Sequence, residues 1–130
     1  AKWLIETLDK SDLVFTIEFN SDHEMNFNPY TNSILFDPTS GLLLMDGSIQ
    51  SPALGLAHEM VHAVIYLYGG AFTDEANVVR QETSVAIELG EPVRKDYNSH
   101  KGSIRVSSSV PDRPKPTYYI RPGYSTQLIH

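Results

Sequence analysis

Two capped helices joined by a very short connection limit the folds open to this chain of 130 residues. Ser51 followed by Pro52 is a strong helix start, because serine caps an N-terminus well and proline fits the first helical position. This helix should run over residues 52–68 and stop at the glycine pair that follows. Thr73 can cap a second helix that ends at Leu89. Since only a few residues connect them, the two helices should pack as an antiparallel hairpin.

The segments around this hairpin predict short strands and a further helix. Between residues 13 and 19, apolar residues alternate with their neighbours, which is typical of a strand with one buried face. The remaining expectations are a helix at 2–10, strands at 33–36 and 42–45, a loop at 20–32 and an irregular tail from residue 111. The predicted fold is therefore α+β, with a small antiparallel sheet packed on the helical hairpin.

Charge and composition exclude several classes of function. The formal net charge is −6 and the basic residues are mostly scattered, whereas a nucleic-acid interface needs clustered lysine and arginine. No apolar run approaches the ~18 residues that a membrane span requires. The chain has no cysteine, so disulfides cannot stabilise it. Its length suits one domain, residues 1–130. A start at Ala1 without an initiator Met or a signal peptide indicates a piece of a longer protein or a processed product.

The segment from His58 to His62 is the part of the sequence that indicates chemistry. It reads His-Glu-Met-Val-His and falls inside the first helix of the predicted hairpin, where residues i and i+4 share one face. Both imidazoles can therefore bind one Zn²⁺, with Glu59 beside the metal as a general base. Zinc lowers the pKa of a bound water towards ~7, and Glu59 can take the proton as that water attacks a carbonyl. The alternative is two ordinary histidines without a metal.

A catalytic zinc site needs a third protein ligand, and the second helix of the hairpin offers two glutamates. If the helices are antiparallel, Glu82 should lie opposite the His58–His62 segment, and Glu75 lies two helical turns away on the same face. The hairpin geometry therefore favours Glu82 as the ligand and Glu75 as its support, with a solvated glutamate as the alternative for either. The other histidines, at positions 23, 100 and 130, lack a partner at a suitable spacing and should be solvated or locally hydrogen-bonded.

The residues around and after this motif resemble a family signature. The matching residues are Asp74-Glu75, Glu82, Glu88-Leu89-Gly90, Pro92, Arg94 and Tyr97. This pattern is similar to that of the effector-type zinc metallopeptidases, bacterial proteins that secretion systems deliver into other cells. The resemblance covers residues 51–97, less than half of the chain, and implies a zincin-like fold with an active-site helix followed by an antiparallel helix.

Arg94 and Tyr97 are also similar to an arginine and tyrosine pair of clostridial neurotoxin light chains. That resemblance implies that both side chains bind the developing oxyanion opposite the zinc. It also implies that Glu82 supports the metal site and that Glu75 is the third ligand, against the hairpin argument. The structural alternative is an ion pair of Arg94 with Glu82 or Glu88, beside a packed surface tyrosine.

The motif and the resemblance together predict a zinc metalloendopeptidase that hydrolyses a protein or peptide substrate. The resemblance further implies a bacterial toxin or effector that is secreted or injected into a target cell, with a possible immunity protein as its partner. Two alternatives share the motif. One is a housekeeping or cell-wall peptidase or amidase with the same zinc chemistry, and the other is an inactive, metal-stabilised interaction module. Neither a nucleic acid nor a membrane is an expected partner.

Overall fold

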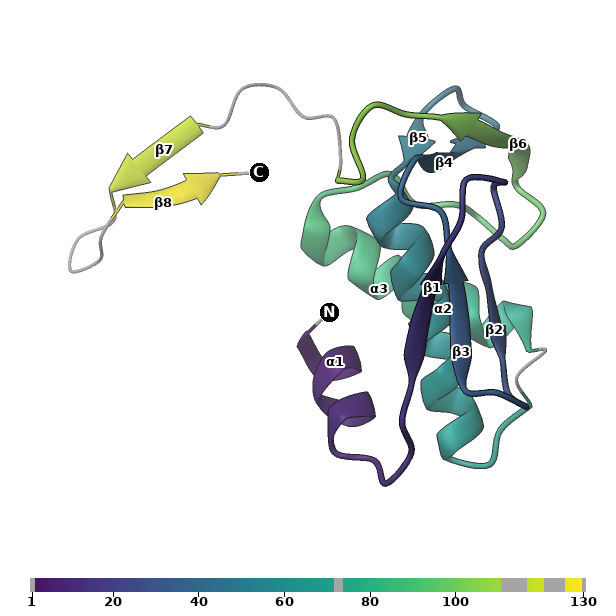
Figure 1. Ribbon diagram of the computed structural model, residues 1–130. Helices are drawn as coiled ribbons and strands as arrows, with labels where there is room; N and C mark the ends of the chain where they lie inside the picture. The colour runs from purple at the N-terminus through teal and green to yellow at the C-terminus, as the bar shows by residue number, and fades with distance from the viewer. Residues whose placement is uncertain (1, 72–73, 111–116, 121–125, 130) are drawn as a thin grey trace.

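The computed structural model of this chain describes residues 2–71, 74–110, 117–120 and 126–129 and confirms an α+β fold (Figure 1). Within these ranges the helices are α1 (Lys2–Asp9), α2 (Pro52–Leu67) and α3 (Glu75–Leu89). The strands are β1 (Thr16–Phe19), β2 (Asn26–Asn28), β3 (Ser33–Phe36), β4 (Ser40–Leu44), β5 (Ile49–Gln50), β6 (His100–Arg105), β7 (Thr117–Ile120) and β8 (Thr126–Ile129).

The caps of the helical hairpin follow the sequence closely. Ser51 caps α2 and accepts a hydrogen bond from a backbone N–H of the first turn, as predicted. The cap of α3 is Asp74, which accepts a similar bond, whereas the sequence favoured Thr73, which lies outside the described residues. Aspartate ranks above threonine as an N-cap residue, so propensity alone would have favoured Asp74. At the other end of α3, Gly90 adopts the left-handed conformation with φ 69°.

Helices α2 and α3 pack antiparallel, as predicted. His58 contacts Glu82, and His62, one turn later on α2, contacts Glu75 at the start of α3. Residue numbers therefore rise along one helix as they fall along the other. This arrangement brings the two halves of the predicted motif, which are far apart in the sequence, to one interface between the helices.

The described strands form three small sheets instead of the single antiparallel sheet that was expected. The first sheet has the order β1-β3-β2 and is mixed, because β1 runs parallel to β3 while β2 runs antiparallel to it. The second, β5-β4-β6, and the third, the β7-β8 hairpin, are antiparallel. Strand β5 ends directly before the cap of α2, so the second sheet lies at the N-terminal end of that helix (Figure 1).

Strand β1 does not have the predicted buried face. All four of its residues are exposed, and Phe19 exposes 71% of its surface. Strand β1 lies at the edge of its sheet, and helix α1 contacts α2. An alternating pattern predicts a strand with an apolar face, but it does not say whether another element will cover that face.

Two segments that were expected to be irregular contain strands. The predicted loop at 20–32 holds β2, in which Phe27 is buried and pairs with Ile34 of β3. The predicted irregular tail from residue 111 holds the β7-β8 hairpin. Asparagine and proline in these segments lower strand propensity, and pairing with a neighbouring strand outweighs that preference.

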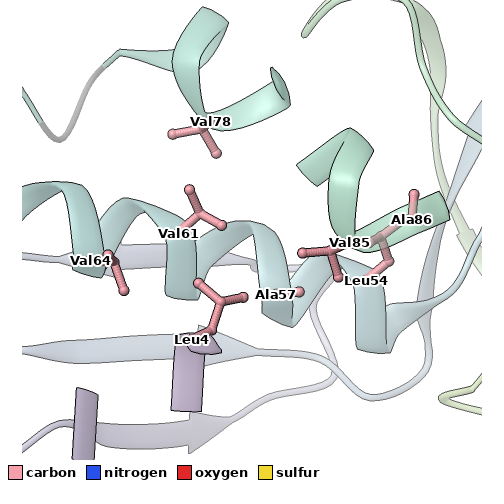
Figure 2. Close-up of a cluster of buried hydrophobic side chains, with 8 residues drawn as sticks. All are labelled: Leu4, Leu54, Ala57, Val61, Val64, Val78, Val85 and Ala86. Atoms are coloured by element: carbon pink, nitrogen blue, oxygen red, sulfur yellow. The ribbon is translucent and has the colours of Figure 1, made fainter. Parts of the chain in front are cut away.

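Helix α2 is central and mostly buried. Nine of its sixteen residues are buried. On one side it packs with α1 and α3 in a cluster that Figure 2 shows, formed by Leu4, Leu54, Ala57, Val61, Val64, Val78, Val85 and Ala86. On another side, Ala63 packs on Phe27 and Ile34 of the first sheet. Among the described residues, no helix has the length and apolar character needed to cross a membrane.

Candidate functional site

The α2 motif places two imidazoles and a carboxylate at one point of the helix surface. His58, Glu59 and His62 are all buried, with 5%, 8% and 5% of their surfaces exposed. The two imidazole rings lie edge to face with centroids 5.0 Å apart. One ligand atom from each of the three residues lies within 4.8 Å of the others, so the group could hold a metal ion.

Helix α3 adds two glutamates that contact different nitrogens of the same histidine. Glu75 lies 3.1 Å from Nε2 of His58 and, through its other oxygen, 3.0 Å from Nε2 of His62. Glu82, which is almost fully buried, lies 2.8 Å from Nδ1 of His58. Glu75 therefore stands where the two Nε2 atoms converge, and Glu82 stands behind His58.

Arg94, in the segment after α3, is buried and binds Glu82. Its Nε donates to Oε2 of Glu82 at 3.0 Å, and its Nη2 donates to Oε1 at 2.8 Å. Its Nη1 donates to the backbone carbonyl of Tyr97 at 3.2 Å. The structural alternative for Arg94, an ion pair with Glu82, is present. Because its donors are engaged inside the protein, the geometry favours a supporting role for Arg94 over the oxyanion contact that the resemblance implied.

The Glu82 contact also fixes the protonation of the His58 ring. An ionised carboxylate can only accept, so the hydrogen between Glu82 and Nδ1 of His58 must belong to Nδ1. Nη2 of Arg94 also lies 2.9 Å from this nitrogen, but it donates its hydrogen bond to Oε1 of Glu82. With Nδ1 protonated, the lone pair of the neutral ring is on Nε2, which faces Glu75 and His62.

Tyr97 is brought to the site, but it is less enclosed than the other residues. It exposes 42% of its surface. Its ring lies over the guanidinium of Arg94 at 5.3 Å and has its centroid 6.1 Å from that of His58. Burial, together with the charges of Glu75 and Glu59, raises the pKa of the Tyr97 hydroxyl, so this group is a proton donor and not an anion.

The carboxylates around His58 raise the pKa of its imidazole ring. Burial disfavours a proton on His58, but the hydrogen bonds to Glu75 and Glu82 and the charge of Glu59 outweigh it and raise the pKa of His58 to about 9. Burial works against ionisation of Glu75 and Glu82 as well, yet their hydrogen bonds to His58 hold both carboxyl pKa values below the ordinary range. The neighbouring carboxylates therefore favour a positive charge at Nε2 of His58.

Glu59 has the properties of a general base. Burial raises the pKa of Glu59 to about 7, with the charge of His58 opposing the shift. Its carboxylate accepts a hydrogen bond from the backbone N–H of Phe27 in β2, which holds it against the first sheet. A carboxyl group that titrates near neutral pH can both take up and release a proton under physiological conditions.

The donor set fits a zinc ion on the chemistry of its atoms. Two neutral imidazole Nε2 atoms and one carboxylate are a known ligand set for catalytic zinc, and here they are Nε2 of His58, Nε2 of His62 and the carboxylate of Glu75. Glu82 on Nδ1 supplies the carboxylate that commonly orients a metal-binding histidine.

A cleft of about 300 Å³ between the helical hairpin and the second sheet is lined by His58, Glu59, Glu75, Glu82, Arg94 and Tyr97. The cleft is also lined by residues to which the sequence assigned no role in the chemistry: His23, Ser40, Gln50 and Ser103. His23 is partly buried and hydrogen-bonded to Ser40, seventeen residues away, so its bond is not the local one that was predicted. Its partners are remote in the sequence, and no spacing rule could have found them.

The other histidines differ in their surroundings. His100, in β6, also lines the cleft, and its ring contacts that of Tyr97 with centroids 6.3 Å apart. Its Nδ1 atom is buried without a hydrogen-bond partner among the described residues, so the prediction of a solvated or locally bonded side chain is wrong for that atom. His130 lies outside the described residues.

Comparisons with known proteins return no match: no protein-family model, no curated protein and no solved structure is similar to this chain at a significant level.

Proposed function

We propose that this protein is a zinc-dependent peptidase with a zincin-like active site. The observation that carries the proposal is the convergence of both α2 imidazoles, through their Nε2 atoms, on the single carboxylate of Glu75. Glu59, a buried carboxyl with a pKa of about 7, lies beside them, and the group opens into a cleft. Catalytic zinc sites combine three protein ligands with a general base and an accessible position.

The proposed ligands are His58, His62 and Glu75. Glu82, which the hairpin argument favoured as the ligand, does lie opposite His58, but its oxygen contacts Nδ1 and its other polar contacts are to Arg94 and Gln50. Glu82 therefore acts as the positioning residue for His58, and Arg94 positions Glu82. This arrangement agrees with the alternative that the neurotoxin resemblance implied.

The mechanism assigns one task to each side chain. Zinc, when bound, supplies Lewis-acid chemistry that polarises a carbonyl and makes water a nucleophile near neutral pH. The Glu59 carboxylate takes the proton from the attacking water and later gives it to the departing amine. Tyr97, protonated and at the cleft wall, is the proposed hydrogen-bond donor to the carbonyl oxygen as it becomes negative.

Zinc content of matched variants tests the ligand assignment. We expect one zinc per chain in the wild type, none in Glu75→Gln, and a zinc ion that is retained but bound more weakly in Glu82→Gln. The opposite order for the two glutamates would return Glu82 to the role of ligand. A wild-type protein that takes up no zinc at neutral pH would contradict the proposal.

Glu59→Gln tests the catalytic step separately. The amide cannot accept the proton, so turnover of a peptide library should fall by about 10²–10⁴-fold while zinc stays bound. Zinc binding without any cleavage by the wild type would favour a metal-stabilised interaction module. That the protein is a toxin or effector, secreted or injected into a target cell and countered by an immunity protein, stays a prediction from the resemblance.

A further inference from the structure

The wall of the cleft opposite α2 holds a histidine and serine pair that the proposed mechanism does not use. Nδ1 of His23 lies 2.7 Å from Oγ of Ser40, and both residues line the same cleft as His58 and Glu59. Among the described residues, this is the only hydrogen bond of the His23 ring. Nε2 of His23 therefore has no hydrogen-bond partner within the described part of the chain.

His23 is held in a backbone conformation that histidine rarely adopts. Its φ is 61°, in the left-handed region, and only Asn32 among the other described non-glycine residues has a positive φ. Such residues cost about 1–3 kcal/mol and persist only where their surroundings enforce them, often at ligand-binding positions. The left-handed backbone of His23 therefore indicates that the surrounding residues hold this side chain at the cleft.

A buried carboxylate enforces this conformation. Asp37, which has no exposed surface, accepts a hydrogen bond from the backbone N–H of His23 at 2.9 Å. Asp37 also accepts from the backbone and hydroxyl of Thr39 and from Nη1 of Arg105. Ser40 is tied to the same turn, since its N–H donates to the carbonyl of Asp37. The position of the His23 ring is thus fixed at its backbone and at Nδ1.

The pair presents the same hydrogen-bonding capacity in either tautomer. If the Ser40 hydroxyl donates to Nδ1, then Nε2–H of the neutral His23 ring is a free donor and the hydroxyl oxygen is a free acceptor. If Nδ1–H donates to Ser40, then Nε2 becomes the free acceptor and the hydroxyl becomes the free donor. In both cases one donor and one acceptor remain for a ligand.

We propose that His23 and Ser40 form a specificity subsite that binds the carboxamide side chain of a glutamine or asparagine residue in the substrate. The proposal rests on the peptidase function proposed above. A carboxamide offers one donor and one acceptor on adjacent atoms, whereas a carboxylate only accepts and an ammonium group only donates. A site built for such pairing rejects a ligand that leaves one of its polar groups unpaired.

Neighbouring residues agree with an uncharged, partly apolar side chain. Met25 and Leu42 line the cleft beside the pair and can contact the methylene groups of glutamine. The subsite selects against acidic residues by pairing, because a carboxylate offers no donor for the free acceptor of the pair.

Peptides that differ only in one residue test the preference. Glutamine, asparagine, glutamate, lysine and alanine are placed in turn at each position within three residues of the cleaved bond. At one position, kcat/KM for the glutamine or asparagine peptide should exceed that for the glutamate and lysine peptides by at least about 10-fold. Cleavage without such a preference at any position would overturn the subsite and leave the peptidase proposal standing.

Two variants assign the preference to these residues. His23→Gly removes the ring and still permits the left-handed backbone, while Ser40→Ala removes the hydroxyl. Each should reduce the preference to about 1-fold without loss of zinc. Asn32→Gly is the matched control, because Asn32 has φ 51° but does not line the cleft, and it should keep the preference. A preference that survives in both His23→Gly and Ser40→Ala contradicts the assignment.

A binding measurement separates this inference from the peptidase proposal. Ring nitrogen resonances of His23 in the wild-type protein are followed by NMR while a glutamine peptide or its glutamate counterpart is added. A shift with the glutamine peptide only supports the subsite, even if no peptide is cleaved and the peptidase proposal fails. Equal shifts with both peptides, or none with either, would overturn it.

Discussion

At the scale of single residues, three glutamates near His58 differ in the atom that each one contacts. Glu75 contacts two Nε2 atoms, Glu82 contacts Nδ1 of His58, and Glu59 is bonded to a backbone amide of β2. These contacts separate their pKa values, since burial raises that of Glu59 to about 7 while Glu75 and Glu82 stay ionised. Three carboxyl groups of similar chemistry thereby acquire different tasks.

Arg94→Gln should weaken zinc binding by about 10–100-fold, the usual effect of losing a group that orients a metal-binding histidine. Glu82 would lose its two hydrogen bonds from Arg94 and would hold Nδ1–H of His58 less firmly. Competition with a chelator measures the zinc dissociation constant. Arg80→Gln removes the same charge from an exposed position on α3 and should leave the constant unchanged. An unaltered constant in Arg94→Gln would exclude the supporting role.

The sequence was sufficient to predict the α2 part of the site, because helical geometry alone puts His58 and His62 on one face. It could not choose between Glu75 and Glu82, since both lie on one face of α3 and the choice depends on which nitrogen each oxygen reaches. The contacts of His23 were also beyond prediction, because they depend on a turn that is set by the buried Asp37.

At the scale of elements, the ends of the helices are determined by local chemistry. Ser51, Asp74 and Gly90 each satisfy backbone groups that the adjoining helix leaves unpaired. Helix boundaries were accordingly predictable to within a residue or two. The strands were less predictable than the helices, because β1 has no covering layer and β2 forms only by pairing with β3. Their existence depends on partners that local patterns do not describe.

Gly90→Ala should lower the free energy of unfolding by about 1–2 kcal/mol, because alanine has a steric penalty in the left-handed region. The backbone there must turn so that the N–H of Glu91 can donate to the carbonyl of Ala86 at 2.8 Å. Chemical denaturation measures the change. Gly90→Asn should recover part of the loss, since asparagine tolerates this conformation. Equal stability of alanine and glycine at this position would show that the turn can relax.

At the scale of the whole molecule, α1 is part of the core. Leu4 exposes only 1% of its surface and lies in the cluster with Leu54, Ala57 and Val61 of α2 (Figure 2). Helix α2 also carries the candidate metal ligands His58 and His62 on another face. The first residues of the described chain therefore contribute to the packing that holds α2 in place.

Leu4→Ala should lower the free energy of unfolding by about 2–5 kcal/mol, as expected when a buried leucine is truncated and a cavity remains. Ile5→Ala is its matched control, since Ile5 exposes 62% of its surface, and the change should be within about 0.5 kcal/mol. Thermal and chemical unfolding of both variants measure the difference. Similar effects of the two substitutions would mean that α1 does not pack as described.

Stability should also decline in acid because of Asp37. Burial opposes ionisation of this carboxyl, but hydrogen bonds from Thr39, His23 and Arg105 hold its pKa far below the ordinary range. A lowered folded-state pKa contributes stability above the unfolded value of about 4, and this contribution is lost as the pH falls towards the folded value. Wild type should therefore be more stable than Asp37→Asn at pH 7, with a smaller difference at pH 3. A difference that is independent of pH would contradict this linkage.

Glu91 joins the end of the helical hairpin to its beginning. Its carboxylate accepts hydrogen bonds from the backbone N–H and the hydroxyl of Ser51, at 2.8 and 2.7 Å. The segment that carries Arg94 and Tyr97 is thus anchored one residue after Gly90, and Arg94 anchors it again at Glu82. A loop held in this way is preorganised, so a ligand need not order it on binding and association loses little conformational entropy. Amide hydrogen exchange at Glu91, whose N–H donates to the carbonyl of Ala86, should consequently be slow before any ligand is added.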